Sequence, residues 1–214
     1  MARLGLAGPQ NKEAMLRDWV RRRLGSVDHE LRVARVARTL FGLSRRWHGL
    51  GAAESRLLAL AALVHDVGRA GGENKHEQRG ARMILESRWL ALETVERRHL
   101  AYLTRYHKGR VPEVWRDGIL DRDEDDAVAL RIVLGLLRAA DSLDSRSLGA
   151  PQLVMGVRGG GRGRRLLAIN GYGGDIAEAE VVYGRRKKFR LLEEALACRV
   201  EIAWCGAKSL ALAS

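Results

Sequence analysis

The sequence contains an adjacent histidine and aspartate, His65 and Asp66, in the stretch AALVHDVGRA. Apolar residues precede the pair and Gly68 follows it, so we expect a buried helix to end there. Burying an imidazole beside a carboxylate costs free energy unless another group compensates both. Imidazole and carboxylate are ordinary ligands of divalent metals, so a metal ion would compensate the two side chains at once.

Other potential metal ligands are spread along the chain. Four of the six histidines fall at the ends or in the first turns of expected helices, beside apolar runs that would hold them in place. They are His29, His65, His76 and His107. Asp141 lies at the C-terminal end of an apolar helix, where a carboxylate is unfavourable unless a cation neutralises it. We interpret His48 and His99 as surface or capping residues.

Six helices are expected to position these residues, because a helical bundle can bring side chains from several helices into one pocket. Apolar periodicity and helix-ending glycine or proline predict them at 11–24, from Ser26 as N-cap toward Gly49, and at 52–64, 75–87, 90–107 and 127–140. The last is nearly all apolar and should be central to the core. We interpret the acidic run DRDEDD before it as charges that complement the helix dipole.

The texture of the sequence changes from Pro151 onward. The stretches QLVMGV and RLLAI predict two strands, residues 178–197 predict a helix, and CRVEIAW predicts a last strand. The GGGRGR turn between the first two strands is better explained as a hairpin connection than as a site for phosphate or nucleic acid. We therefore predict a mainly α fold, with a helical domain at 1–150 and a small α+β subdomain at 151–214, in the order strand-strand-helix-strand.

Composition indicates a soluble globular protein with anionic partners. The 214 residues are 46% hydrophobic and 30% charged, and the net charge is +12. No apolar run approaches the roughly 18 to 20 residues that span a bilayer, and the first residues lack a signal-peptide core, so we expect a cytoplasmic protein. Phosphorylated small molecules are the favoured partners. Nucleic acid is possible but not favoured, because the many arginines are spread through every segment; a homodimer is also possible.

The order H…HD…H…H…D on a helical chain resembles the HD-domain superfamily of metal-dependent phosphohydrolases. It is most similar to the HD module at the C-terminal end of the exopolyphosphatase / guanosine pentaphosphate phosphohydrolase family. The stretches that carry the resemblance are VDHELRVARVA, LAALVHDVGRA, KHEQRGARMI, RYHKGRVP and LLRAADSLDSR. The small strand-and-helix tail of that family has a counterpart in residues 153–204. The resemblance implies an HD-domain helical bundle with a small C-terminal appendage.

The resemblance also implies a metal-ligand set. One metal would be held by His29, His65, Asp66 and Asp141. Asp66 would bridge to a second metal that His76 and His107 complete, although these two histidines could instead contact substrate beside a single metal. We therefore expect two divalent ions. A ligand set of oxygen and nitrogen suits Mn, Fe, Mg, Co or Ni and does not choose among them.

The implied function is a metal-dependent phosphohydrolase. A metal-activated water would cleave a phosphoester or phosphoanhydride bond of a nucleotide, nucleotide polyphosphate or polyphosphate-like substrate, with Asp66 and His65 at the centre of the catalytic site. Candidates for binding phosphate are Lys108 and Arg69, then Lys75 and Arg110, each of which could equally be an ordinary surface charge. Full-length family members carry a separate nucleotide-hydrolysing domain ahead of the HD module. These 214 residues hold nothing of that size, so we expect any hydrolysis to depend on the HD site.

Two alternatives belong to other classes of protein. A regulatory HD module could hold a nucleotide or polyphosphate without turnover, although an intact set of six ligands argues against a decayed site. A nucleic-acid-binding protein could use the arginine-rich surface. It would lose affinity steeply with added salt and would be indifferent to the loss of Asp66.

Overall fold

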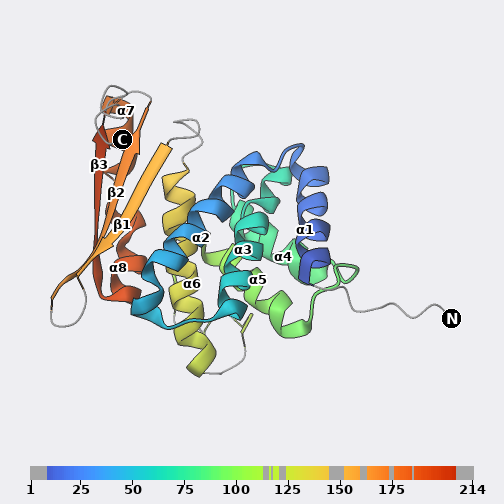
Figure 1. Cartoon of the computed structure of the whole chain (residues 1–214). Helices are drawn as coiled ribbons and strands as arrows, with labels where there is room; N and C mark the ends of the chain where they lie inside the picture. Colours follow the sequence, from blue (N-terminus) through green and yellow to red (C-terminus); the bar gives the residue numbers. More distant parts are fainter. Residues whose placement is uncertain are drawn as a thin grey trace.

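Helices form most of the molecule, and a small sheet lies at one side of the helical bundle (Figure 1). The structure is a computed structural model that describes residues 9–112, 116, 118–120, 124–144, 152–159, 163–173, 176–184 and 186–205. The helices of the bundle are α1 (Pro9–Leu24), α2 (Asp28–His48), α3 (Ala52–Val64), α4 (His76–Glu86), α5 (Thr94–Tyr106) and α6 (Glu124–Leu143), with a short 3-10 helix η1 (Val67–Gly71) after α3. The predicted mainly α fold with a small α+β part is confirmed.

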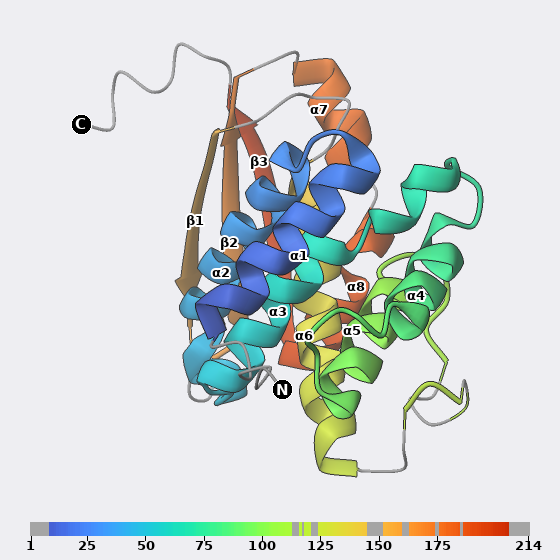
Figure 2. The ribbon, with the colours of Figure 1, turned by 90° about the vertical axis from the view of Figure 1, so that its right-hand side faces the viewer.

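Helix α3 is the centre of the bundle. Its residues from Leu58 to Val64 are all buried, so it is apolar on every side and must be enclosed by other helices. It packs against α1, α2, α5 and α6. Figure 2 shows α1 in front of α3, with α2 on one side and α4 and α5 on the other. The His65-Asp66 pair therefore follows directly on a helix whose second half is buried on every side.

Helix α6 is longer than predicted, since it runs from Glu124 to Leu143. It begins within the acidic run DRDEDD, whose first three residues lie outside the described part of the chain. Its apolar residues pack against α2, α3 and α8 (Arg190–Leu196). A side chain at Gly135 would be 3.1 Å from the Cα of Leu192, so the absence of a Cβ lets the backbone of α8 approach closely. Asp141 is placed in the last turn of α6.

Two predicted helix starts were wrong. Ser26 is not the N-cap of α2: that position is Val27, although the Ser26 hydroxyl accepts a hydrogen bond from the backbone N–H of Asp28 at 3.1 Å. Helix α5 begins at Thr94 instead of near Leu90, because the chain turns at residues 87–93.

The Arg97 guanidinium stabilises this turn between α4 and α5. It donates hydrogen bonds of 2.7 to 2.9 Å to three backbone carbonyls, those of Ile84, Ser87 and Leu90. Carbonyls at the end of a helix lack partners within that helix, and here an arginine from the next helix supplies them. Leu90 is buried in the core although it lies in this turn. Its apolar side chain therefore fitted the pattern of a helix face in the sequence and made the predicted helix begin too early.

The C-terminal segment forms a three-stranded sheet in the order β1-β2-β3. Strands β1 (Gln152–Arg158) and β2 (Arg165–Tyr172) are antiparallel, which confirms the hairpin; residues 160–162 of its turn lie outside the described residues. Strand β3 (Cys198–Cys205) is parallel to β2. Leu167, Ile169 and Val200 are buried on the inner face of the sheet and join the same core cluster as the helices.

The predicted helix at 178–197 was wrong as a single element. The structure divides it into α7 (Ile176–Tyr183), a 3-10 helix η3 (Arg186–Lys188) and α8. Gly184 is a poor helix former, and four consecutive basic residues follow it, so like charges would repel across the turns of a continuous helix. The division into domains at residue 150 stays a prediction. Within the described residues, no helix has the length and apolar character needed to cross a membrane.

Gly68 provides a test of how tightly the bend after Asp66 is packed. A Cβ at this position would collide with the backbone oxygen of His76 and the backbone of Gly80. We expect Gly68→Ala to lower the free energy of unfolding by about 1 to 3 kcal/mol, because backbone atoms cannot yield. Urea unfolding measures this. Gly42→Ala is the matched control, since its Cβ would meet nothing within 4 Å, and equal stability of the two variants would contradict the packing.

Candidate metal centre

The six predicted ligands converge from five parts of the helical bundle. His29 comes from the first turn of α2, His65 and Asp66 follow α3, and the other three come from α4, α5 and α6. Five of the six are buried, and Asp141 is 17% exposed through its side chain. The structure thus brings together every residue of the predicted ligand set: His29, His65, Asp66, His76, His107 and Asp141.

Two imidazoles face one side of the buried carboxylate of Asp66. The Nε2 atoms of His29 and His65 each lie 3.9 Å from its Oδ2 atom. The same two nitrogens each lie 3.4 Å from Oδ1 of Asp141. Two imidazole nitrogens and two carboxylates therefore surround one small space.

The other two imidazoles face the second oxygen of the same carboxylate. The Nε2 atom of His76 lies 3.1 Å from Oδ1 of Asp66, and Nε2 of His107 lies 3.4 Å from it. These two nitrogens are 3.3 Å apart. Asp66 is thus shared, because Oδ2 faces His29 and His65 while Oδ1 faces the other pair.

Three of the four imidazole rings are held by the same local hydrogen bond. Nδ1 of His65, His76 and His107 each donates to the backbone carbonyl three residues earlier, at 2.8, 2.8 and 2.7 Å respectively. A carbonyl oxygen only accepts, so the proton of each neutral ring is on Nδ1 and the lone pair is on Nε2. Hydrogen bonds of this kind fix the orientation of metal-ligating histidines. In the neutral form that binds a metal, all three Nε2 lone pairs therefore face the centre of the cluster.

The ring of His29 is held by a side chain that sequence reasoning missed. Its Nδ1 lies 2.8 Å from Oδ2 of Asp144, and the Arg32 guanidinium donates to both oxygens of that carboxylate at 2.9 and 3.2 Å. Burial would raise the pKa of Asp144, but these hydrogen bonds lower it, so the carboxylate stays charged. Asp144 follows Asp141 by three residues and comes directly after α6, a spacing that could have revealed it.

The charges of the cluster are strongly coupled. Burial would raise the pKa of Asp66, but the charge of His65 and a hydrogen bond with His107 hold it far below its usual range. Burial would lower the pKa of His65, but the carboxylates of Asp66 and Asp141 raise it to about 9. The pKa of Asp141 is also lowered, against the effect of burial, by His29 and His65. Without metal, His65 therefore carries a proton near pH 7, and a metal ion would displace it.

The donor set suits divalent metals. His29, His65 and Asp66 offer ligand atoms within 4.8 Å of one another, and so do Asp66, His76 and His107. Imidazole nitrogens with inward lone pairs beside ionised carboxylates match the preferences of first-row divalent ions. These buried groups could therefore hold metal ions, and a cation would relieve the crowding of lone pairs and negative charge in the centre.

The predicted phosphate-binding residues lie at different distances from this cluster. Arg69 is in contact with it, because its Nε donates to Oδ2 of Asp66 at 2.6 Å and its guanidinium pairs with Glu73. Lys108 follows the predicted ligand His107 and lies 4.0 Å from the Glu73 carboxylate. Lys75 and Arg110 are exposed, before α4 and beyond α5. A role in binding phosphate stays a prediction for all four.

A cavity of about 470 Å³ lies beside the cluster. His107 and Asp141 line it, so two predicted ligands border open space. The other lining residues are Lys108, Gly109, Arg138, Ser142, Lys187 and Lys188. Sequence reasoning missed Arg138 and the two lysines, because nothing in the sequence shows that η3 approaches α6.

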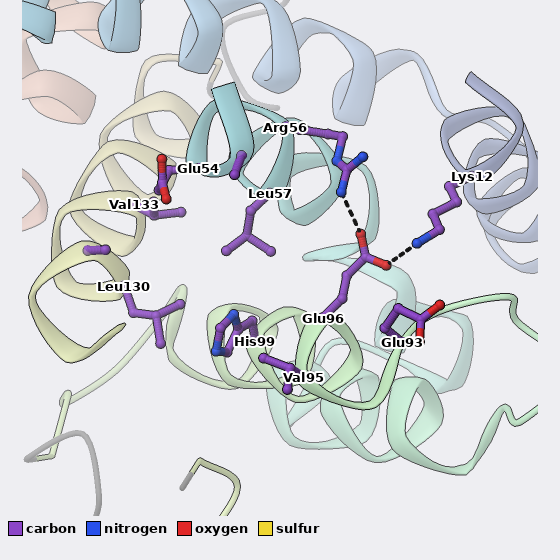
Figure 3. A pocket seen from close by; sticks show the side chains of 12 residues that line it. Lys12, Glu54, Arg56, Leu57, Glu93, Val95, Glu96, His99, Leu130 and Val133 are labelled. Carbon is purple, nitrogen blue, oxygen red and sulfur yellow. Dashed lines mark hydrogen bonds and ion pairs between the residues drawn. The ribbon is translucent and has the colours of Figure 1, made fainter. Parts of the chain in front are cut away.

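The two remaining histidines lie elsewhere. His48 is a capping residue, as predicted: its Nδ1 accepts from the backbone N–H of Leu50 at 2.9 Å. His99 lines a separate cavity of about 360 Å³ with an apolar floor (Figure 3). Its central carboxylate, Glu96, pairs with Lys12 at 2.7 Å and with Arg56 at 3.7 Å. Its lining has three carboxylates against two basic side chains, so this second cavity is less suited to an anion than the first.

Fold and site together define a helical protein with a buried histidine-carboxylate cluster able to hold divalent metal. The family model described as Ppx/GppA phosphatase, domain III, matches residues 26–148, more than half of the chain, and the matched range contains all six residues. The chain belongs to the Ppx/GppA phosphatase family. Membership in a phosphatase family makes a phosphorylated small molecule the expected kind of substrate. A search of curated proteins found no match.

Asp144 allows the outer hydrogen bonds of the cluster to be tested. We expect Asp144→Ala to weaken the metal site that contains His29 by about 10- to 100-fold, because the ring loses the group that orients it. Asp144→Asn, which keeps an accepting oxygen, should lose much less. Calorimetric titration with Mn²⁺ measures both. Asp18→Ala, which removes a half-exposed carboxylate, is the control, and an unchanged affinity in Asp144→Ala would contradict the assignment.

Proposed function

We propose that this chain is an HD-type metal-dependent phosphohydrolase that binds two divalent metals. The substrate class is a nucleotide, a nucleotide polyphosphate or a polyphosphate-like compound, cleaved at a phosphoester or phosphoanhydride bond. One observation supports this function most strongly: the two oxygens of the buried Asp66 carboxylate face two different pairs of imidazole nitrogens. A carboxylate in that position is suited to bridge two cations.

The proposed ligand sets follow the two sides of Asp66. His29, His65 and Asp141 would complete one site with it, and His76 and His107 would complete the other. When bound, a pair of divalent metals lowers the pKa of water, polarises a phosphoryl oxygen and offsets the charge that develops during phosphoryl transfer. The metal could be Mn, Fe, Mg, Co or Ni, since the donor set alone does not choose.

The protein's own groups orient the site and supply positive charge. Outward hydrogen bonds hold the rings, so the nitrogens need not reorganise when a substrate arrives. Phosphoryl transfer depends on positioning and positive charge more than on covalent chemistry. Lys108 stands beside the ligand His107 and is suited to hold a phosphoryl oxygen. It faces the mainly exposed Glu73 carboxylate, as does Arg69, so a substrate phosphate would take the place of Glu73.

The loss of Asp66 tests this function directly. We expect Asp66→Asn, which preserves shape and removes the charge, to reduce hydrolysis by at least about 10³-fold, because both metal sites lose their shared ligand. The assay offers Mn²⁺-loaded protein a panel of nucleotides, nucleoside polyphosphates, inorganic polyphosphate and generic phosphoesters.

Asp18→Asn is the matched control, since its carboxylate is half exposed and pairs with Arg21 on α1. It should retain full activity. If every compound in the panel stays intact while metal is bound, the chain is a regulatory binding module and not an enzyme. Hydrolysis that survives in Asp66→Asn would place the chemistry at another site.

A further inference from the structure

The cavity beside the metal centre is built from two distant parts of the chain. One wall consists of the end of α5 and the last turns of α6, which carry His107, Lys108, Arg138 and Asp141. The other wall comes from η3, which contacts α6 and contributes Lys187 and Lys188. The C-terminal appendage thus completes a cavity whose inner end is the candidate metal centre.

Specific contacts hold η3 in this position. On its N-terminal side, the hydroxyl of Tyr183 donates to the carbonyl of Leu143, at the end of α6, at 2.9 Å. On its C-terminal side, Phe189 is 1% exposed and is part of the core. The two lysines therefore lie on a short segment fixed at both ends, and the break after α7 is what brings them to the cavity.

The charges of the cavity are strongly unbalanced. Four basic residues line it: Lys108, Arg138, Lys187 and Lys188. Its one lining carboxylate among the described residues is Asp141, which faces the imidazoles of the metal cluster at 3.4 Å. A cavity of about 470 Å³ has more room than a single phosphate needs and falls within the size range of small-molecule sites.

The four cations differ in kind and in exposure. Arg138 is fixed, because its guanidinium donates to the carbonyl of Gly109 at 3.0 Å and to that of Tyr106 at 3.5 Å, on either side of His107. Lys187 is exposed and Lys188 is half-buried, and each carries its ammonium group at the end of a long aliphatic side chain. An ammonium group on such a stem binds a phosphate oxygen as a point charge without demanding one geometry.

We propose that Lys187 and Lys188 form a second phosphate subsite, so that the preferred substrate carries at least two phosphate groups. One group would lie at the metal centre and the next would lie on the lysine pair. This inference rests on the proposed function, because it takes the metal centre as the place of the first phosphate. It makes the appendage part of the substrate site and gives the two lysines a role in specificity.

The test compares two non-hydrolysable probes on the full chain loaded with Mn²⁺. Methylphosphonate presents one phosphate-like group and methylenediphosphonate presents two. We expect the wild-type protein to bind the diphosphonate at least about tenfold more tightly. The double variant Lys187→Ala/Lys188→Ala should lose that preference, while its affinity for methylphosphonate stays within about twofold. Isothermal titration calorimetry measures both affinities, and metal content is measured for each protein.

Two further variants keep the test decisive. Lys187→Met/Lys188→Met retains the apolar stems and removes only the charges, so it answers the question if the alanine variant unfolds more readily. Arg190→Ala/Arg199→Ala removes two charges from the same appendage outside the cavity and should keep the preference.

Three results would overturn the subsite: equal binding of the two probes by wild type, a preference that survives in both lysine variants, or an equal loss in the arginine control. The proposed function fails separately. If no phosphate compound is hydrolysed but the preference depends on the lysines, then the subsite stands and the chain is a binding module.

Discussion

The carboxylate of Asp66 lies in the interior between two pairs of imidazoles, and much of the surrounding structure is arranged to make this burial tolerable. An ionised carboxylate away from water is costly unless charged and hydrogen-bonding groups surround it. Here the guanidinium of Arg69 donates to the carboxylate, protonated His65 adds a nearby positive charge, and the other imidazoles surround it. A divalent metal on each side would satisfy the remaining lone pairs. Helix α3, whose second half is fully buried, leads directly to this residue, and the close contact at Gly68 holds the bend that follows.

The convergence of the ligands depends on local hydrogen bonds as much as on the bundle. Three histidines bind the carbonyl three residues before them, so each ring is oriented by its own turn of backbone. His29 sits in the first turn of α2, and the carboxylate of Asp144, just after α6, orients its ring instead. The packing of the bundle therefore has only to bring these helix ends together, because local hydrogen bonds already fix the direction in which each histidine points its Nε2 atom. This division between local and long-range constraints explains how ligands far apart in sequence form one compact cluster.

The six residues of the cluster could be picked out from sequence because histidines and aspartates at the ends of apolar helices leave a visible pattern, and the family resemblance implied that they belong together. His65 and Asp66 after α3, and Asp141 near the end of α6, are the clearest cases. Features that depend on contacts between distant segments could not be predicted. Asp144 meets His29 across 115 positions of sequence. Lys187 and Lys188 reach the cavity only because helix α7 ends at Tyr183, whereas the sequence had suggested one continuous helix through this region.

A titration with Mn²⁺, followed by electron paramagnetic resonance, tests the central claim most directly. The shared carboxylate predicts two Mn²⁺ per chain, and the second ion should produce the spectrum of an exchange-coupled pair, because both ions would bind the two oxygens of Asp66. Asp66→Asn should abolish that coupled signal. Binding of a single uncoupled ion, or of two ions whose spectrum is unchanged in Asp66→Asn, would contradict the account.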